Sequence, residues 1–213
     1  MKTFFESFIK GVLAGVCIAL GGTVFLLTDS RLAGALLFTV GLFTICTFGF
    51  SLYTGKICYV FERDGKYALA LIPIWLGNLA GTVAVAELEL LTRQGAAIAE
   101  KAKALAQTKL DDGLLSIFIL SVLCDVLIYI AVEGFSSIPH QAGKYLALFF
   151  GVVVFIMSGF EHCVANMYYF AAASSWTWKT LLRVAVMTLG NSVGGVLIPL
   201  ARMLAGRLAK KQH

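Results

Sequence analysis

The stretch GFEHCVANMYYF, residues 159–170, places two ionisable side chains, Glu161 and His162, in the middle of an apolar and aromatic segment. An ionisable group inside a membrane-spanning segment is costly, and it generally faces a bundle interior or a water-filled path. The meaning of this stretch therefore depends on whether the surrounding chain lies in a membrane. Composition and segmentation answer that question.

The composition of the chain is that of an integral membrane protein. Of its 213 residues 59% are hydrophobic and 14% are charged, whereas a soluble domain carries about 25% charged residues. The net charge of +5 is spread over loops and termini, so we predict no nucleic-acid partner. The five cysteines lie singly without a CxxC pair, which predicts no metal site and no disulfide framework. We predict no cofactor.

Charged residues divide the chain into six apolar segments, each near the ~20 residues that cross a bilayer. The segments are residues 11–28, 32–61, 67–86, 113–132, 145–178 and 184–201. The predicted fold is an all-α integral membrane protein with six transmembrane helices and both termini on one side. The polar stretch 93–112 is expected to be a linking loop.

Two copies of one motif indicate an internal repeat. LGNLAGTV (76–83) and LGNSVGGV (189–196) both read LGNxxGxV, at the end of each group of three segments. Three spans per half give the halves opposite orientations, and the second segment of each half is interrupted by polar residues. Paired broken helices of an inverted repeat point to a central site. We predict one domain, 1–213, with repeat A at about 6–92 and repeat B at about 113–206.

The motif has a second interpretation, because Asn78 and Asn191 can serve helix packing alone through bonds across helices. We assign both asparagines a structural role. Counting basic residues does not orient the chain, because they divide evenly between the two sides. The Lys210–Lys211 pair favours cytoplasmic termini in the cell membrane.

The polar residues at the two interruptions are the candidate site. His162 is expected to line a pore, the alternative being a neutral core imidazole bonded to a backbone carbonyl. Glu161 points about 100° away on a helix and is expected to bond backbone groups freed by the break. Asn166 lies on the face of His162 and can orient it. Thr54 either faces His162 as a hydrogen-bond donor or caps a helix end.

Three further charged residues lie in or beside the apolar segments. Asp125 in the fourth segment can pair with a cation, be protonated, or lie near a water-filled vestibule. Lys109 and Lys144 stand at the starts of segments four and five, where lysines commonly snorkel to the interface.

The stretch GFEHCVANM (159–167) resembles the signature of the formate/nitrite transporter family, which reads GFEH, a small residue and then ANM. SLYTGK (51–56) is similar to the loop that interrupts the second helix of that family. Residues 6–22 resemble its first helix and LGNSVGG its sixth. The resemblance implies a homopentamer with an aquaporin-like fold, each protomer carrying small monovalent anions such as formate, nitrite or hydrosulfide.

The resemblance also implies roles for individual residues. His162 matches the central pore histidine, Thr54 the hydroxyl of the interrupting loop, and Lys109 the vestibule lysine. Lys144 is assigned a structural role, the alternative being a place in the opposite vestibule. The implied apolar constrictions are Phe38, Leu42, Leu52, Tyr53 and Phe155, and Ile128 is assigned with them. Two residues depart from the family pattern, namely Asp125, where Asn is usual, and Lys56 after the loop threonine.

We therefore predict a channel or transporter for small anions or weak acids, proton-linked through His162. An intramembrane enzyme is disfavoured, because the sequence has no HExxH or GxSxG motif. An aquaporin-type channel for neutral small solutes is the alternative function.

Overall fold

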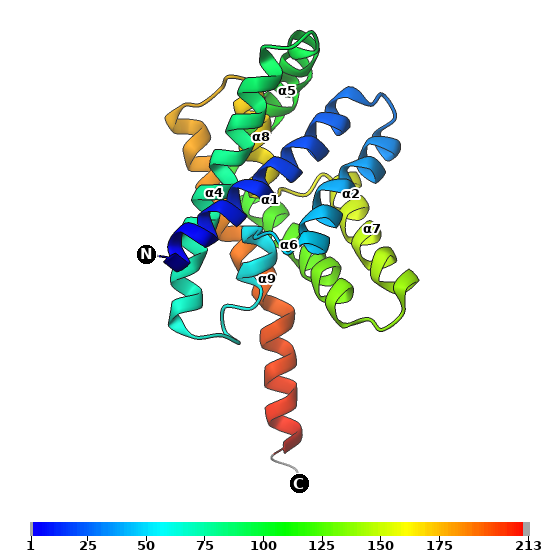
Figure 1. Ribbon diagram of the computed structural model, residues 1–213, viewed down its shortest axis with the longest axis vertical. Helices are drawn as coiled ribbons and strands as arrows, with labels where there is room; N and C mark the ends of the chain where they lie inside the picture. Colours follow the sequence, from blue (N-terminus) through cyan, green and yellow to red (C-terminus); the bar gives the residue numbers. More distant parts are fainter. Residues whose placement is uncertain (1, 211–213) are drawn as a thin grey trace.

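The computed structural model describes residues 2–210, and these residues form nine α-helices (Figure 1). The helices are α1 (Lys2–Leu27), α2 (Arg31–Phe48), α3 (Tyr53–Ile57), α4 (Gly65–Leu90), α5 (Gly95–Asp111), α6 (Leu114–Ser137), α7 (Gln141–Met157), α8 (Cys163–Ala172) and α9 (Trp178–Lys210). The all-helical prediction is confirmed. Lys211, half of the pair used to orient the chain, lies outside the described residues.

Five of the described helices are long and apolar enough to cross a membrane, namely α1, α2, α4, α6 and α9. Helix α7 is apolar but shorter, with 17 residues. The predicted second and fifth segments each correspond to a pair of helices, α2 with α3 and α7 with α8. A count of six crossings requires these two pairs to act as single spans and stays a prediction.

The stretch 93–112 is not a loop, because it contains helix α5. Alanine, lysine and glutamine are strong helix formers, and they dominate this segment. Ile98, Ala102, Ala106 and Lys109 are buried at helical spacing, so one face of α5 packs onto the molecule. Helix α5 lies at one end of the molecule, opposite the end where the C-terminal part of α9 projects (Figure 1).

The helices pack in the same order in the two halves of the chain. Helix α1 packs against α2 and α4, and α6 packs against α7 and α9. The pairs α1–α4 and α6–α9 approach closely at the LGNxxGxV motifs. A Cβ atom on Gly81 would overlap the carbonyl oxygen of Val12, and one on Gly194 would overlap that of Val122. The glycines of the motif therefore permit backbone contact between helices.

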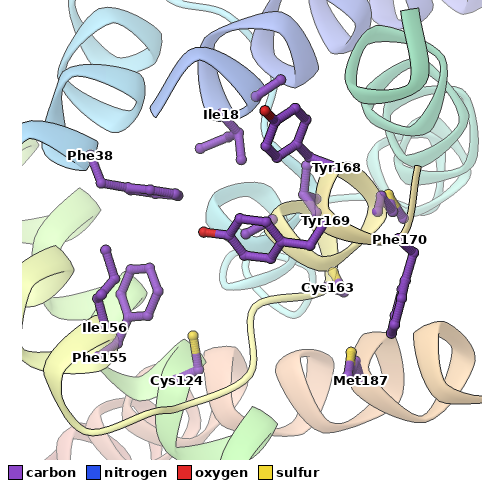
Figure 2. Close-up of a cluster of buried hydrophobic side chains, with 14 of the residues drawn as sticks. Ile18, Phe38, Cys124, Phe155, Ile156, Cys163, Tyr168, Tyr169, Phe170 and Met187 are labelled. Carbon is purple, nitrogen blue, oxygen red and sulfur yellow. The ribbon is translucent and has the colours of Figure 1, made fainter. Parts of the chain in front are cut away.

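The two short helices cross between the halves, since α8 packs against α4 and α3 packs against α9. Helix α8 is buried along its whole length, and Tyr168, Tyr169 and Phe170 project from it in different directions (Figure 2). Large apolar side chains such as Leu37, Phe150 and Leu115 are exposed on the outside. An apolar exterior of this extent suits a lipid environment.

Candidate functional site

The interruptions in the two broken helices have the same backbone geometry. Helix α2 ends at Gly49 with φ +69°, and the segment after α7 turns at Gly159 with φ +70°. A left-handed conformation at these positions favours glycine. The amide of the following phenylalanine then bonds back to the helix, from Phe50 to Ile45 and from Phe160 to Phe155, each at 3.0 Å. The Gly-Phe dipeptide shared by both breaks is a sequence signal that the sequence reasoning did not use.

Asn78 of α4 fixes the first break through three hydrogen bonds. Its Oδ1 accepts from the amide of Tyr53 at 2.8 Å, and its Nδ2 donates to the carbonyls of Ser51 at 2.9 Å and Gly11 at 2.8 Å. The side chain is fully buried. Because the amide of Tyr53 opens α3, this asparagine satisfies a helix terminus inside the molecule.

Asn191 of α9 makes the corresponding bonds at the second break. Its Oδ1 accepts from the amide of Cys163 at 2.8 Å, and its Nδ2 donates to the carbonyls of Glu161 at 2.9 Å and Ser121 at 2.8 Å. The two LGNxxGxV asparagines therefore do more than join helices: each holds the start of a short helix and the loop before it. Non-helical backbone at membrane depth needs such internal partners.

Thr54 and His162 meet across the two halves of the chain. Thr54 Oγ1 lies 3.0 Å from His162 Nε2, and both side chains are buried. His162 is the N-cap of α8, and its Nδ1 accepts a hydrogen bond from the amide of Ala165 at 3.2 Å. An accepting Nδ1 carries no proton, so Nε2 carries it and donates to Thr54. The ring is a neutral imidazole in this arrangement.

Apolar side chains surround this pair. The rings of Phe38 and Phe155 meet edge to face with centroids 6.1 Å apart, and Phe155 stacks on His162 at 5.7 Å. Phe38 and Phe155 also lie near one another in Figure 2. Leu42 and Leu52 are each 2% exposed. The predicted constriction residues Phe38, Leu42, Leu52 and Phe155 are thus gathered near the centre, and Ile128 is buried in the same apolar core.

Two cavities approach the pair from opposite ends of α2. The α5-side cavity, of about 70 Å³, includes Arg31 at the start of α2. Its lining is Phe25, Arg31, Leu105, Lys109, Phe155, Ile156, Gly159, Phe160, His162, Ala165, Asn166 and Tyr169. The α3-side cavity, of about 170 Å³, includes Gly49 at the end of α2. Its lining is Leu42, Ile45, Cys46, Gly49, Phe50, Leu52, Gly55, Lys56, Tyr59, Val132, Phe135 and Ser136.

Glu161 forms a buried ion pair with Lys109, which corrects the role predicted for it. Lys109 Nζ donates to the two carboxylate oxygens at 2.8 and 2.6 Å, and the side chains are 10% and 7% exposed. Asn166 Nδ2 donates to the same carboxylate at 2.8 Å and to the carbonyl of His162 at 2.9 Å. Asn166 therefore holds Glu161 and the backbone of His162 and does not bond to the imidazole. The predicted direction of the Glu161 side chain was wrong because it assumed a helix, and residues 159–162 are not helical.

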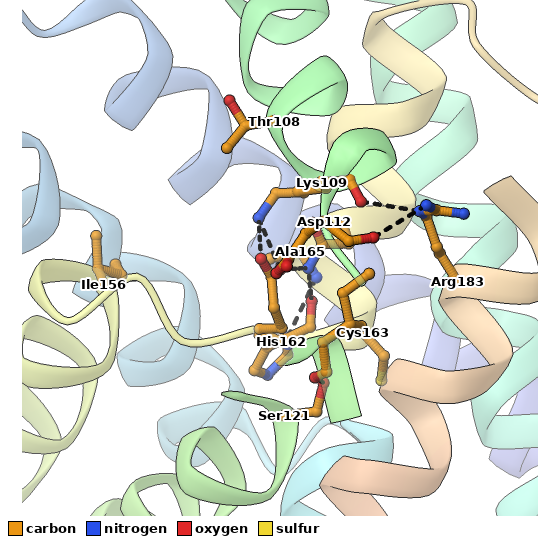
Figure 3. A network of polar contacts seen from close by, with 12 residues as sticks. Thr108, Lys109, Asp112, Ser121, Ile156, His162, Cys163, Ala165 and Arg183 are labelled. Carbon is orange, nitrogen blue, oxygen red and sulfur yellow. Dashed lines mark hydrogen bonds and ion pairs between the residues drawn. The ribbon is translucent and has the colours of Figure 1, made fainter. Parts of the chain in front are cut away.

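Arg183 of α9 anchors the end of α5 that carries Lys109. Its guanidinium donates to the carbonyl of Lys109 at 2.8 Å and to the carbonyls of Leu110 and Asp112. Figure 3 shows Lys109 reaching toward the segment that carries His162, with Arg183 on the other side of the α5 end. The sequence gives no signal for this role of Arg183, because its acceptors lie more than 70 residues away along the chain.

Asp125 lies away from both cavities. It is fully buried on α6, and neither carboxyl oxygen has a hydrogen-bond partner among the described residues. A Cβ atom on Gly195 would lie 2.5 Å from Asp125 Oδ2 and 3.1 Å from Cys58 Sγ, so the carboxyl packs between α9 and the end of α3. Of the three alternatives left open, pairing with a cation has no support, because no cation contacts the carboxyl within residues 2–210.

Two predicted residues lie elsewhere. Tyr53 follows Leu52 by one residue, so its side chain points in a different direction from that of Leu52. The hydroxyl of Tyr53 donates to Ser192 Oγ at 2.9 Å. Its side chain lines a surface groove with Trp75, outside both cavities. Lys144 lies with Nζ 6.0 Å from the ring centroid of Phe135 and lines neither cavity. Tyr53, predicted as a constriction residue, is thus absent from the lining of both cavities, and Lys144 lies against Phe135 of the α3-side cavity.

The apolar helices, the matched helix breaks and the buried polar pair define a helical membrane protein of the channel or transporter class. The family model described as "Formate/nitrite transporter" matches residues 1–204. The chain belongs to this family. Its relatives are channels and transporters, not enzymes.

Individual relatives agree with this assignment. The chain is 28% identical to the formate channel FocA of Haemophilus influenzae, over 78% of this chain and 66% of that protein. It is 33% identical to the transporter YrhG of Bacillus subtilis, over 78% of this chain and 68% of that protein. The chain thus spans about two thirds of the length of these two relatives.

A solved structure of a pentameric formate channel with formate bound superposes with a TM-score of 0.80 at 26% identity. The superposition covers 96% of this chain and 98% of that one. The fold is therefore that of the formate/nitrite transporter channels.

Proposed function

We propose that this protein conducts small monovalent anions or their weak acids, such as formate, nitrite or hydrosulfide, past the Thr54–His162 pair. The observation that carries the proposal is the placement of this buried polar pair between two cavities at opposite ends of α2. Apolar side chains on either side of the pair, Phe38 and Phe155 toward one cavity and Leu42 and Leu52 toward the other, select small solutes. Relatives include formate channels and the nitrite transporter NirC of Escherichia coli, which is 31% identical.

The pair offers a substrate one free hydrogen-bond donor, the hydroxyl of Thr54. The Nε2–H of neutral His162 is directed at Thr54 Oγ1, and the hydroxyl proton of Thr54 is then available to an anion oxygen. Donors held in place inside an apolar enclosure stabilise a passing negative charge strongly, because no solvent competes. Asn78 and Asn191 hold the two backbone segments that carry this pair.

Proton linkage follows from the titration of the imidazole. A second proton binds at Nδ1, which requires the ring to give up the hydrogen bond from Ala165. The resulting imidazolium donates its Nε2 proton to the substrate anion, which leaves a neutral acid and an imidazole protonated at Nδ1. Return of that proton to Nε2 restores the starting tautomer and the hydrogen bond from Ala165. The neutral acid crosses the apolar constrictions at lower cost than the anion does. Each transfer thus couples one proton to one substrate.

The assembly and location are part of the same proposal. We infer six membrane crossings, with α2 and α3 forming one and α7 and α8 another, and both termini on the cytoplasmic face of the cell membrane. The lipid bilayer surrounds the exposed apolar side chains. A homopentamer in which every protomer has its own pore is supported by the pentameric formate channel of similar fold.

Uptake by proteoliposomes tests the function. Formate, nitrite, hydrosulfide and glycerol are compared by stopped-flow light scattering, with protein-free liposomes as the baseline. We expect uptake of at least one of the three weak acids above the baseline, and none of glycerol. Uptake of glycerol alone would replace this proposal with the aquaporin-type channel.

A further inference from the structure

The cation expected to attract anions in the α5-side cavity is already neutralised. Lys109 Nζ is bound by both oxygens of the Glu161 carboxylate, at 2.8 and 2.6 Å. The pair is buried and has no net charge. The attraction of Lys109 for an approaching anion is therefore largely cancelled at distances longer than the ion pair itself.

Arg31 is the remaining cation of that cavity. It opens α2, lines the cavity with His162, and has one guanidinium hydrogen bond, from Nη2 to the carbonyl of Ile156 at 3.1 Å. That carbonyl is neutral and belongs to the last turn of α7. No ion pair joins Arg31 to a carboxylate in residues 2–210. The guanidinium has five N–H donors, so most of them are left for a ligand.

Lys56 is the cation that lines the α3-side cavity. It follows Thr54 by two residues on α3, and among the residues lining that cavity it is the one with a formal charge at neutral pH. Its backbone is fixed, because its amide bonds to the carbonyl of Leu52 at 2.9 Å and its carbonyl accepts from the hydroxyl of Tyr67 at 2.7 Å. Within the described part of the chain its ammonium group has no carboxylate partner.

We propose that Arg31 and Lys56 are the anion-selecting residues of this protein, each supplying the uncompensated positive charge of one of the two cavities. A cleft with apolar walls and one sign of charge focuses the field and raises the local concentration of the opposite ion. The two cations line the two cavities at opposite ends of α2, on either side of the Thr54–His162 pair. Arg31 therefore governs entry from the α5 side and Lys56 governs entry from the α3 side. The proposal rests on the anion transport proposed above.

Oriented membranes separate the two contributions. Formate uptake is measured at low ionic strength in intact cells and in inverted membrane vesicles, for the wild type, Arg31→Gln and Lys56→Gln. We expect each neutral variant to lower the initial rate about 3–10-fold in one orientation, and the two variants to act in opposite orientations. High salt should reduce both effects, because it screens exposed charges.

Two controls make the result specific to charge. Arg31→Lys and Lys56→Arg keep the charge and should retain most of the wild-type rate. Arg207→Gln removes an exposed cation on the C-terminal part of α9 that lines neither cavity, and it should leave the rate unchanged in both orientations. Wild-type rates in Arg31→Gln and Lys56→Gln, or an equal loss in Arg207→Gln, would overturn the assignment while leaving anion transport intact. Absence of formate, nitrite and hydrosulfide uptake by the wild type would overturn both proposals together.

Discussion

The two asparagines of the LGNxxGxV motifs give the most quantitative prediction, because the structure assigns them matching bonds. Replacing Asn191 by Ala removes three buried hydrogen bonds, to Cys163, Glu161 and Ser121. Side-chain hydrogen bonds in membrane proteins contribute about 0.6 kcal/mol on average and up to about 1.7 kcal/mol. Three bonds therefore predict a loss of roughly 2–5 kcal/mol in the free energy of unfolding. Asn78→Ala removes the same number of bonds at the other break and should cost a similar amount.

The assay is thermal unfolding of the detergent-solubilised protein. At about 3 °C per kcal/mol for a chain of this size, each variant should lower the midpoint by roughly 6–15 °C. Ser192→Ala, one residue from Asn191 and partly exposed, is the matched control. It removes two side-chain bonds, with Tyr53 and Thr188, and at the average of about 0.6 kcal/mol per bond it should cost about 1 kcal/mol. Formate uptake should fall in Asn191→Ala even at temperatures where it stays folded, because the backbone on both sides of His162 is released. A midpoint within about 1 °C of wild type in either variant would refute the reasoning.

Two further substitutions test the buried charges. Asp125→Asn should preserve transport, since the carboxyl has no partner among the described residues. For the same reason its thermal unfolding midpoint should be unchanged or higher. A loss of transport would show that Asp125 acts as an ion. Glu161→Gln should cost about 3–5 kcal/mol, because it leaves the ammonium of Lys109 buried and unpaired. Lys109→Met combined with Glu161→Gln should recover much of that loss in the same assay, and a double variant less stable than Glu161→Gln would contradict the ion pair.

Much of the fold was predictable because membrane crossing imposes long apolar segments. The position of the site was also predictable, because polar side chains at two breaks in an apolar chain mark the irregular backbone that lines a cavity. The LGNxxGxV motif predicted the internal repeat. It did not predict that Asn78 and Asn191 bond to the broken segments, because these bonds join residues far apart in the sequence.

The errors have physical causes. The stretch 93–112 was expected to be a loop because it is polar, but its alanine-rich composition forms an amphipathic helix that packs on α8. The role predicted for Glu161 assumes helical geometry, which does not apply in the non-helical segment where it lies. Its partner Lys109 belongs to helix α5 and lies 52 residues away in the sequence. Local sequence patterns do not predict a contact over that separation.

The most direct test of the central claim is the pH profile of formate uptake in His162→Asn. Asparagine at an N-cap accepts the amide hydrogen bond that Ala165 now gives to the ring, but it does not titrate. After subtraction of protein-free liposomes, wild-type uptake should rise as the pH falls, because protonation of the imidazole supplies the transferred proton. His162→Asn should still conduct formate and should lose this rise. An identical pH profile in the wild type and His162→Asn would contradict proton linkage through His162.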